Sequence, residues 1–583
     1  MHWKWKQRHR QRLSAERGTI RKDWRGKVRI ALAFPNRYAV AMSNLGFQSV
    51  YAALNEVDHV VCERVFYPET ADLPHVKQHP GSLLSLESQR PVREFDLVAF
   101  SVPYENDYSH VVEMLSLAGI EPRAARRSRE SPVVAAGGVA VILNPEPLSP
   151  FMDFFFIGEA EGMLPDLEGR WGEFPERRDD RPDFLHQLAR EVSGIYVPSL
   201  YTDSYLADGT LRSLDPVHKD LPEKISYGRG KLDRAKPSRT VVLTPETEFS
   251  DVTLLEIGRG CGRGCRFCAA GYVYRPVRFH AGSRVVDAAA ERLGESPRVG
   301  LVSAAVSDHP EIDFICRSLL DRGASLSFSS LRADGITPEI ASTLEAGRHQ
   351  AAALAPEAGS DRLRKLINKN LTVEQVHRAV KELVDKGVMH LKLYFMIGLP
   401  TETAEDLEAV VDLVKGIRHE ILKSSRGRTR LGTVTLSVHS FVPKPFTPFQ
   451  WAPFAGVREL KDRGKRLQRT LQKVANVRVH FDLPKWAYVQ ALLSRGDRRV
   501  ASILEKVALE GVGWTQAMRS APANPDFWVM RERGKEEIFP WEIVDLGLKK
   551  SFLWEEYRRA LRGEPSPPCR PHENCRRCGV CAP

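Results

Sequence analysis

The sequence predicts an α/β protein in which two runs of alternating strands and helices follow one another. Its 583 residues exceed what one hydrophobic core usually holds, so several domains are expected. The first alternation predicts a Rossmann-like parallel sheet, the second predicts a partial (β/α)6 barrel, and the rest is expected to be mainly helical with a cysteine-rich end. The expected domains are a basic arm (1–27), the Rossmann-like domain (28–200), a connector (201–248), the barrel (249–455) and the C-terminal region (456–583).

The first alternation consists of apolar runs separated by helical stretches. The expected strands are 28–34, 95–100, 132–138 and 151–157, and the expected helices are 45–54 and 109–117. Glycines follow the last two strands, at Gly137, Gly138 and Gly158. Because parallel strands separated by helices end at one edge of a sheet, a ligand is expected at that carboxyl edge.

The second alternation begins at residue 249. Its expected strands are 252–257, 299–303, 325–329, 350–355, 390–396 and 433–441. Strands in this number, each followed by a helix, suit a partial barrel. In such barrels chemistry gathers at the carboxyl ends of the strands, so polar side chains at the strand exits are candidates for a site.

Composition limits the possible partners and location. The net charge of +11 and the pI near 9.1 permit a nucleic acid or another anionic partner, and they are equally compatible with ordinary solubility. No run of about 18 apolar residues occurs, so no membrane span is expected. The basic N-terminus is not followed by an apolar stretch, so no secretory signal is expected and a cytoplasmic location is predicted.

Three cysteines give the chain its most specific motif, C-x3-C-x2-C, at Cys261, Cys265 and Cys268. Three thiolates leave one iron of a four-iron cluster open to a substrate, whereas structural zinc or a closed electron-transfer cluster uses four ligands. Phe267 precedes the last cysteine, and glycines at 258, 260, 262 and 264 allow the backbone to wrap closely around a cofactor. The alternative is a surface loop with three incidental thiols.

This motif resembles that of the radical S-adenosylmethionine (radical SAM) superfamily. The resemblance implies a barrel with a [4Fe–4S] cluster, on whose open iron S-adenosylmethionine (SAM) is held by its amino and carboxylate groups. The reduced cluster passes one electron to the sulfonium, the carbon–sulfur bond breaks, and a 5′-deoxyadenosyl radical or an equivalent species forms. An electron donor such as flavodoxin or ferredoxin is also implied.

The resemblance further implies residues that contact SAM at the strand exits. The chain departs from the family at 301–305, where many relatives carry Gly-Gly-Glu, and several of its segments resemble those of methylthiotransferases. Each residue alone is equally explained as a helix cap or a loop contact, and no catalytic group beyond the cluster is identified. The expected SAM contacts are Phe267, Ser303, Ser330, Arg332, Glu357, Ser360, Ile397 and Gly398.

The N-terminal series Gly137, Gly138, Gly158 and Glu159 resembles the vitamin B12-binding domain that precedes the barrel in class B radical SAM proteins. The Asp-x-His-x-x-Gly motif that supplies a histidine to cobalt is absent. Two predictions therefore stay open: a domain that binds cobalamin, or one that has lost the cofactor and serves for packing or substrate docking. As a whole the chain resembles uncharacterised radical SAM proteins with a B12-binding-like N-terminal domain.

A second cysteine cluster closes the chain, at Cys569, Cys575, Cys578 and Cys581. Four thiolates can enclose a metal completely, and the spacing suits an auxiliary [4Fe–4S] cluster or a zinc knuckle about equally. Seven of the nine cysteines lie in the two clusters, which favours metal binding over disulfides. Because the clusters are far apart in sequence, truncation after Pro568 is expected to leave the central one intact.

Two functions follow from these motifs. The first is a radical SAM enzyme that methylates or otherwise modifies an unactivated carbon, with or without cobalamin, on an RNA or a ribosome-associated substrate. The second is a non-catalytic nucleic-acid-binding protein that uses a zinc knuckle and the basic arm, with Trp3 and Trp5 for stacking. The three-cysteine motif separates them, because a binding module has no use for an open iron.

Overall fold

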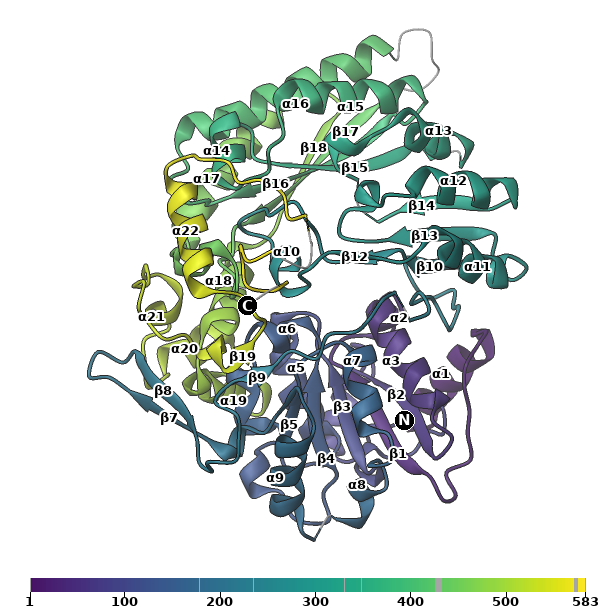
Figure 1. Ribbon diagram of the computed structural model, residues 1–583, viewed down its shortest axis with the longest axis vertical. Coiled ribbons are helices and arrows are strands. Elements are labelled where there is room, and N and C mark those ends of the chain that lie inside the picture. The colour runs from purple at the N-terminus through teal and green to yellow at the C-terminus, as the bar shows by residue number, and fades with distance from the viewer. Residues whose placement is uncertain are drawn as a thin grey trace. The chain divides into compact units, whose positions relative to one another are not determined.

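The computed structural model describes residues 2–177, 179–233, 235–329, 331–347, 349–424, 432–570 and 575–581, and it divides the chain into two compact units (Figure 1). Unit 1 comprises Met1–Asp251, Leu492–Trp528 and Glu536–Leu546. Unit 2 comprises Val252–Ala491, Val529–Lys535 and Gly547–Pro583. The stretch 201–248 thus belongs to unit 1, and residues 456–583 contribute to both units.

Unit 1 is built on one six-stranded sheet of order β2-β1-β3-β4-β5-β6. The first five strands in that order are parallel and β6 is antiparallel to β5. The four strands expected from the sequence are confirmed, together with the α/β fold class. The strands are β1 (Val28–Phe34), β2 (Val60–Phe66), β3 (Leu97–Ser101), β4 (Val133–Gly137), β5 (Phe154–Phe156) and β6 (Ile195–Tyr196).

Helices cover both faces of this sheet, which explains why most residues of its strands are apolar. One face packs in a core cluster with side chains of α1, α3 and α9, and the other face meets α5. The hairpin β7 (Tyr201–Tyr205)–β8 (Leu211–Pro216) follows, and β9 (Ile225–Ser226) pairs with β19 (Val544–Asp545). The helices of the unit are α1 (His2–Ala15), α2 (Tyr38–Met42), α3 (Leu45–Glu56), α4 (Leu73–Gln78), α5 (Tyr108–Leu117), α6 (Val139–Leu143), α7 (Ala160–Met163), α8 (Glu173–Glu176), α9 (Arg181–Glu191), α19 (Ala501–Ala508) and α20 (Trp514–Arg519).

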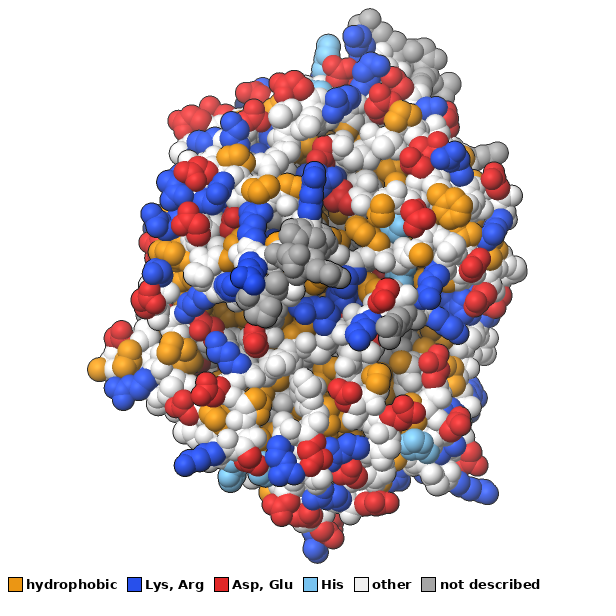
Figure 2. Space-filling view, in the orientation of Figure 1, with side chains coloured by type: hydrophobic (Ala, Val, Ile, Leu, Met, Phe, Trp, Pro, Cys, Tyr) orange, Lys and Arg blue, Asp and Glu red, His pale blue; other side chains and the backbone are white. Residues whose placement is uncertain are grey.

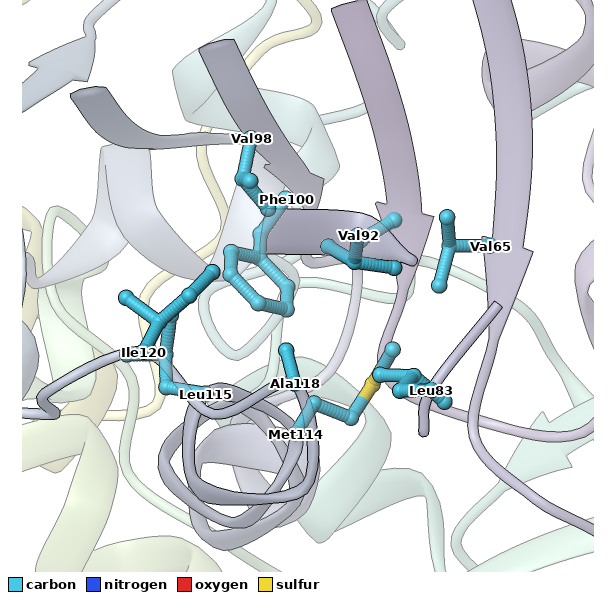
Figure 3. A pocket seen from close by; sticks show the side chains of 10 residues that line it. Val65, Leu83, Val92, Val98, Phe100, Met114, Leu115, Ala118 and Ile120 are labelled. Carbon is cyan, nitrogen blue, oxygen red and sulfur yellow. The ribbon is translucent and has the colours of Figure 1, made fainter. Parts of the chain in front are cut away.

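A small pocket lies between the sheet of unit 1 and α5 (Figure 3). Side chains of β3 and α5 point into it in the close-up. Its lining offers no polar side chain to orient a ligand, so it is a packing gap of the core. The lining residues are Ala33, Val65, Leu83, Val92, Val98, Phe100, Met114, Leu115, Ala118 and Ile120.

Edge strand β2 was not expected, because charged residues interrupt its apolar run. Every residue of β2 is buried, including Arg64. The Arg64 guanidinium pairs with Glu16 at 2.7 Å and with Glu87 at 2.6 Å. A buried charge is tolerated when it is paired and hydrogen-bonded in this way, so a charged strand can lie inside a core.

The predicted basic arm contains a docked helix, α1. Trp5 is 5% exposed and packs edge-on against His9, whereas Trp3 is 64% exposed. Arg12 pairs with Glu69 at 2.7 Å and with Glu246 at 3.0 Å. Trp5 is therefore not free to stack on a base, which corrects one premise of the nucleic-acid-binding hypothesis.

Unit 2 contains two parallel sheets, of order β10-β13-β14 and β15-β16-β17-β18, joined by a parallel bridge between Leu331 and Leu354. The six strands expected for the barrel are confirmed. The seventh, β18, alternates Val477, Val479 and Phe481 with polar residues, and it was not predicted. The strands are β10 (Val252–Glu256), β13 (Arg298–Val302), β14 (Ser325–Phe328), β15 (Ala351–Glu357), β16 (His390–Ile397), β17 (Thr433–Ser440) and β18 (Val477–Phe481).

Helices alternate with these strands as expected. The C-terminal helix α22 is drawn in yellow beside α14 in Figure 1, and the two helices are in contact. Among the described residues, no helix is both long and apolar enough to span a membrane. The helices are α10 (Ala270–Val273), α11 (Gly282–Leu293), α12 (Ile312–Asp321), α13 (Pro338–Ala346), α14 (Asp361–Leu366), α15 (Val373–Asp385), α16 (Ala404–Ser424), α17 (Val457–Leu471), α22 (Lys550–Leu561), and α18 (Pro484–Arg495) and α21 (Asp526–Val529), which each cross a unit boundary along the chain.

Candidate cluster site

The loop that carries Cys261, Cys265 and Cys268 follows β10 directly. It begins with a short hairpin, β11 (Gly258–Arg259) paired with β12 (Arg278–Phe279). Gly260 has φ +84°, and a Cβ there would lie 2.5 Å from the Tyr274 carbonyl oxygen, so this glycine is required by the chain's own path. The loop then turns sharply, with the Cys268 N–H donating to the Cys265 carbonyl at 3.1 Å.

The three thiols of this loop are electrostatic neighbours in a largely buried place. Burial raises the pKa of the Cys261 thiol, and Cys265 acts in the same direction. Burial also raises the pKa of Cys268 to about 12, with further contributions from Cys265 and Cys261. Three thiols in one loop fit a cluster that takes all three as thiolates. A bound metal would then supply positive charge that stabilises the thiolates against burial.

Two cations from other elements lie near the thiols. Arg332, after β14, lowers the Cys261 pKa against the dominant effect of burial, and Lys369, after α14, does the same for Cys268. Arg332 donates to the Lys369 carbonyl at 3.0 Å, and the Lys369 ammonium lies 3.3 Å from Glu357. Arg332 was expected from the sequence and Lys369 was missed. In the sequence, Lys369 is marked by its position between two asparagines, Asn368 and Asn370. The structure gives both asparagines a left-handed backbone.

Two of the expected SAM contacts near the first strand exits, Ser303 and Phe267, lie in the described part of the chain. Ser303, after β13, is 8% exposed, and its carbonyl accepts a hydrogen bond from the Ser329 hydroxyl at 3.2 Å. Phe267 is half-buried in the cysteine loop. Ser330 lies outside the described residues.

Glu357 is the last residue of β15 and Ser360 follows the strand. The two side chains differ in their contacts. Glu357 has φ +68°, a costly conformation for a residue with a side chain, and its carboxylate faces Lys369. The Ser360 hydroxyl caps α14 by accepting from the Leu363 N–H at 3.2 Å, and it donates to Asp406 at 2.5 Å. Ser360 therefore has a sufficient structural role, whereas Glu357 is held beside the cations.

Ile397 and Gly398 end β16. The Ile397 carbonyl accepts from the Phe441 N–H at 2.9 Å. Gly398 has φ +85°, its N–H donates to Glu402 at 2.8 Å, and a Cβ there would lie 2.6 Å from Leu460. Packing and backbone conformation thus account for this glycine without a ligand.

The C-terminal cysteines lie against the central loop. The Cys569 N–H donates to the Gly262 carbonyl at 2.5 Å, next to Cys261 in the chain. A Cβ on Gly262 would lie 2.7 Å from the Cys569 carbonyl oxygen, so this glycine makes room for the tail. The two cysteine motifs are therefore in contact although they are far apart in sequence, and the effect of truncation after Pro568 stays a prediction.

The tail thiols are also neighbours of one another. Burial raises the pKa of Cys569, Arg275 opposes this, and Cys578 and Cys575 reinforce it. The pKa of Arg275 is raised against the effect of burial, by Tyr272 first and then by Cys569 and Cys578, which places Arg275 near the tail thiols. No group of three or more His, Cys, Asp or Glu side chains within the described ranges is already arranged to hold a metal ion.

Comparison with known proteins identifies the family. A family model described as radical SAM proteins, N-terminal, matches residues 46–198, and one described as the radical SAM superfamily matches residues 255–414. The uncharacterized protein MJ0966 of Methanocaldococcus jannaschii is 30% identical over 431 residues, which cover 72% of this chain and 82% of that protein. The chain belongs to the radical SAM superfamily.

Two named enzymes match shorter stretches of this radical SAM protein, and a solved structure is similar to it over a longer one. The anaerobic magnesium-protoporphyrin IX monomethyl ester cyclase of Rubrivivax gelatinosus is 30% identical over 173 residues, 28% of this chain and 30% of that protein. The tRNA-2-methylthio-N(6)-dimethylallyladenosine synthase of Buchnera aphidicola is 21% identical over 297 residues, 46% and 64% of the two chains. The radical SAM methyltransferase TsrM of Kitasatospora setae, solved with tryptophan and a SAM analogue, gives a TM-score of 0.47 at 13% identity, covering 74% of this chain and 76% of that chain.

The glycines predicted to admit cobalamin in unit 1 of this radical SAM protein are packed against its own backbone. A Cβ would lie 2.6 Å from the Val102 carbonyl oxygen at Gly138, 2.6 Å from the Gly228 carbonyl oxygen at Gly158, and 3.2 Å from Phe156 at Gly137. Glu159 accepts from the Tyr227 hydroxyl and the Gly230 N–H, both at 3.1 Å. These contacts explain the series without a cofactor.

Proposed function

We propose that Cys261, Cys265 and Cys268 bind a [4Fe–4S] cluster with one open iron, and that the protein uses it with SAM to modify an unactivated carbon. The observation that carries this proposal is the gathering of three neighbouring thiols in one loop at the carboxyl edge of the unit 2 strands, with Arg332 and Lys369 beside them. When bound, the cluster supplies the electron that cleaves SAM reductively.

The chain's own groups would hold and orient the reactants. Arg332 and Lys369 balance the negative charge of the thiolates. The Glu357 carboxylate accepts hydrogen bonds from ribose hydroxyls of SAM, and the Ser303 carbonyl accepts from its amino group. Phe267, Ser330, Ile397 and Gly398 are proposed to contact the remaining nucleoside surface, and Ser360 to support Glu357.

Methylation is the reaction proposed for this site, on an RNA or a ribosome-associated substrate. Two observations support an RNA substrate: one distant relative is a tRNA-2-methylthio-N(6)-dimethylallyladenosine synthase, and the chain carries a net charge of +11. Lys and Arg are interspersed with Asp and Glu on the face shown in Figure 2, so charge alone marks no nucleic-acid track there. No cysteine in the described part of the chain forms a disulfide, in keeping with the reducing cytoplasm that we propose as the location, with flavodoxin or ferredoxin as electron donor.

Cobalamin binding by unit 1 is proposed only in a restricted form. The sheet order β2-β1-β3-β4-β5 brings the carboxyl ends of its parallel strands to one edge, where such folds bind ligands. Gly138 and Gly158 already have backbone against them, so a corrin would have to contact other parts of that edge. For Gly137, Gly138, Gly158 and Glu159, packing is the better supported role.

The four tail cysteines are proposed to bind a second metal, as zinc or as an auxiliary [4Fe–4S] cluster. Burial raises the pKa of Cys569, and Cys578 and Cys575 act in the same direction, which places these two side chains near Cys569. The absence of a ready-made site among the described residues is compatible with a metal that draws its ligands together on binding.

Anaerobic reconstitution tests the main proposal. The wild-type protein with dithionite should bind about four irons at the central site and convert SAM to 5′-deoxyadenosine. Cys261→Ala, Cys265→Ala and Cys268→Ala should each abolish this conversion while the four-cysteine tail remains. Full conversion by all three variants would contradict the cluster assignment. A colourless protein containing only zinc would favour the nucleic-acid-binding alternative.

A further inference from the structure

Helix α22 presents Glu556, which contacts both cysteine motifs of unit 2, and Phe552, which contacts Arg577 of the tail motif and Arg275 shortly after the central motif. Each motif contributes an arginine from between its cysteines. Arg266 stands between Cys265 and Cys268, and Arg577 stands between Cys575 and Cys578. Residues four apart on a helix lie on one face, so a single face of α22 serves both contacts.

On the central side, Glu556 pairs with a fully buried arginine. Its Oε2 lies 3.3 Å from Arg266 Nη2, and the two side chains are 5% and 0% exposed. The Ser566 hydroxyl donates to the same oxygen at 2.6 Å and accepts from Arg266 at 2.9 Å. Arg266 also donates to the carbonyl oxygens of Leu366, at 3.0 Å, and Glu564, at 2.7 Å. The middle of the cysteine loop is thus fixed by the C-terminal segment.

On the tail side, the other oxygen of the same carboxylate is used. Glu556 Oε1 accepts from Arg577 Nη2 at 3.0 Å. Phe552 lies between two guanidinium groups, with Arg577 at 5.6 Å and Arg275 at 5.4 Å from its ring centre. Arg275 lies near Cys569 and Cys578. The Cys578 carbonyl accepts from the Lys549 N–H at 2.9 Å, just before α22.

Two further links join the tail to the central loop. Cys569 donates its N–H to the Gly262 carbonyl at 2.5 Å. The Ser566 N–H donates to Asn368 Oδ1 at 2.8 Å, and Asn368 Nδ2 donates to the Gly264 carbonyl at 3.1 Å. The cysteine loop is therefore linked to the tail at Gly262 and at Arg266, and through Asn368 at Gly264. About 300 residues separate Arg266 from Ser566 in the sequence.

We propose that metal binding by the four tail cysteines locks the loop of the SAM cluster in place, and that Glu556 is the positioning residue that couples the two sites. This inference rests on the proposed central cluster and second metal. A thiolate-bound metal fixes the conformation of the tail, and with it Arg577, Cys569 and the segment around Ser566. Coupling of this kind is reciprocal, so each site should hold its metal better when the other is filled.

The experiment compares Glu556→Gln with Glu555→Gln in the full-length reconstituted protein. Glu555 is on the same helix, but it is half exposed and pairs with Arg562 at 3.0 Å. Release of central iron to a chelator is followed together with the electron paramagnetic resonance spectrum of the reduced cluster. Glu556→Gln should release central iron about tenfold faster and broaden its spectrum, and Glu555→Gln should match wild type.

Variants on the tail side keep the test decisive if Glu556→Gln folds poorly. Arg577→Gln breaks only the more exposed pair, and Arg576→Gln, at an exposed neighbouring residue, is its control. Cys575→Ala with Cys578→Ala should lose the second metal, whether iron or zinc, and accelerate central iron release by a similar factor. Adding Glu556→Gln to that pair should change little more, because both changes break one pathway.

The outcomes separate this inference from the proposed function. A wild-type protein that binds no central iron would overturn the proposed function itself. Central iron that is bound and cleaves SAM, but is released at the wild-type rate in Arg577→Gln and in the tail variants, would overturn the coupling alone. Tail variants that leave the total metal content unchanged would likewise overturn it, because no second metal would exist to act.

Discussion

The carboxyl edges of the parallel strands in unit 1 and in unit 2 both carry glycines and acidic residues, yet these residues make different contacts in the two units. In unit 2, Arg332 from the exit of β14 lies near Cys261, and Lys369, after α14, lies near Cys268 and pairs with Glu357 at the end of β15. In unit 1 the backbone of Val102 packs against Gly138, and the backbone of Gly228 packs against Gly158. A glycine at a strand exit therefore marks a close approach of something, and only the surrounding contacts tell whether that is ligand or protein.

The acidic residues at the two edges follow the same division. Glu159 in unit 1 is 5% exposed and accepts from two donors of its own unit. Glu357 in unit 2 faces a lysine across 3.3 Å on a backbone that its side chain disfavours. Strain of this kind persists where surrounding structure imposes it, and it clusters at functional sites. The comparison thus supports the proposed chemistry at the edge of unit 2, and it favours packing as the role of Gly138, Gly158 and Glu159 in unit 1.

Removing a cation from the edge of unit 2 should give the largest effect on activity. We expect Lys369→Met to lower SAM cleavage about 100-fold, because a preorganised charge near developing or resident negative charge is hard to replace. Lys365→Met, on the exposed side of α14, is the matched control. Formation of 5′-deoxyadenosine per bound iron is the measurement, and equal rates in the two variants would remove Lys369 from the site.

Filling a glycine at the edge of unit 1 should change stability and leave the chemistry alone. Gly138→Ala places a Cβ 2.6 Å from the Val102 carbonyl oxygen at φ +105°. The unfavourable backbone conformation alone costs about 1–3 kcal/mol, and the clash adds to that. Calorimetry should show a lower melting temperature with unchanged SAM cleavage per folded protein.

Gly169→Ala is the control for this substitution, because Gly169 has φ +85° but nothing within 4 Å of a Cβ. The difference between the two variants isolates the contact with Val102. A Gly138→Ala protein that is as stable as Gly169→Ala but no longer binds added cobalamin would reverse the comparison. That result would support cobalamin binding at the carboxyl edge of the unit 1 sheet.

Much of this organisation was predictable because it depends on local patterns. The six barrel strands and four strands of unit 1 follow from apolar runs, and the cysteine motif from its spacing. β2 and β18 were missed because buried ion pairs and polar alternation hide their apolar character. Lys369 and the contact between Cys569 and Gly262 were missed because tertiary packing alone brings them to the site.

The smallest expected effect concerns the acid sensitivity of unit 1, through His9 on α1. Burial, reinforced by Arg12, lowers the pKa of His9 from 6.5 to about 3. The unfolded chain therefore takes up the proton first as the pH falls. The stability that this neutral histidine contributes is fully present above about pH 6.5 and is lost as the pH falls toward 3, at about 1.4 kcal/mol per pH unit.

Between pH 6.5 and 5.5 the loss should be about 1 kcal/mol in wild type and absent in His9→Gln, as followed by the melting temperature. His59→Gln, at an exposed histidine of the same unit, should keep the wild-type slope. A His9→Gln protein with an unchanged pH slope would show that His9 is not the acid-sensitive group, and the stability of unit 1 would have to depend on pH through other residues.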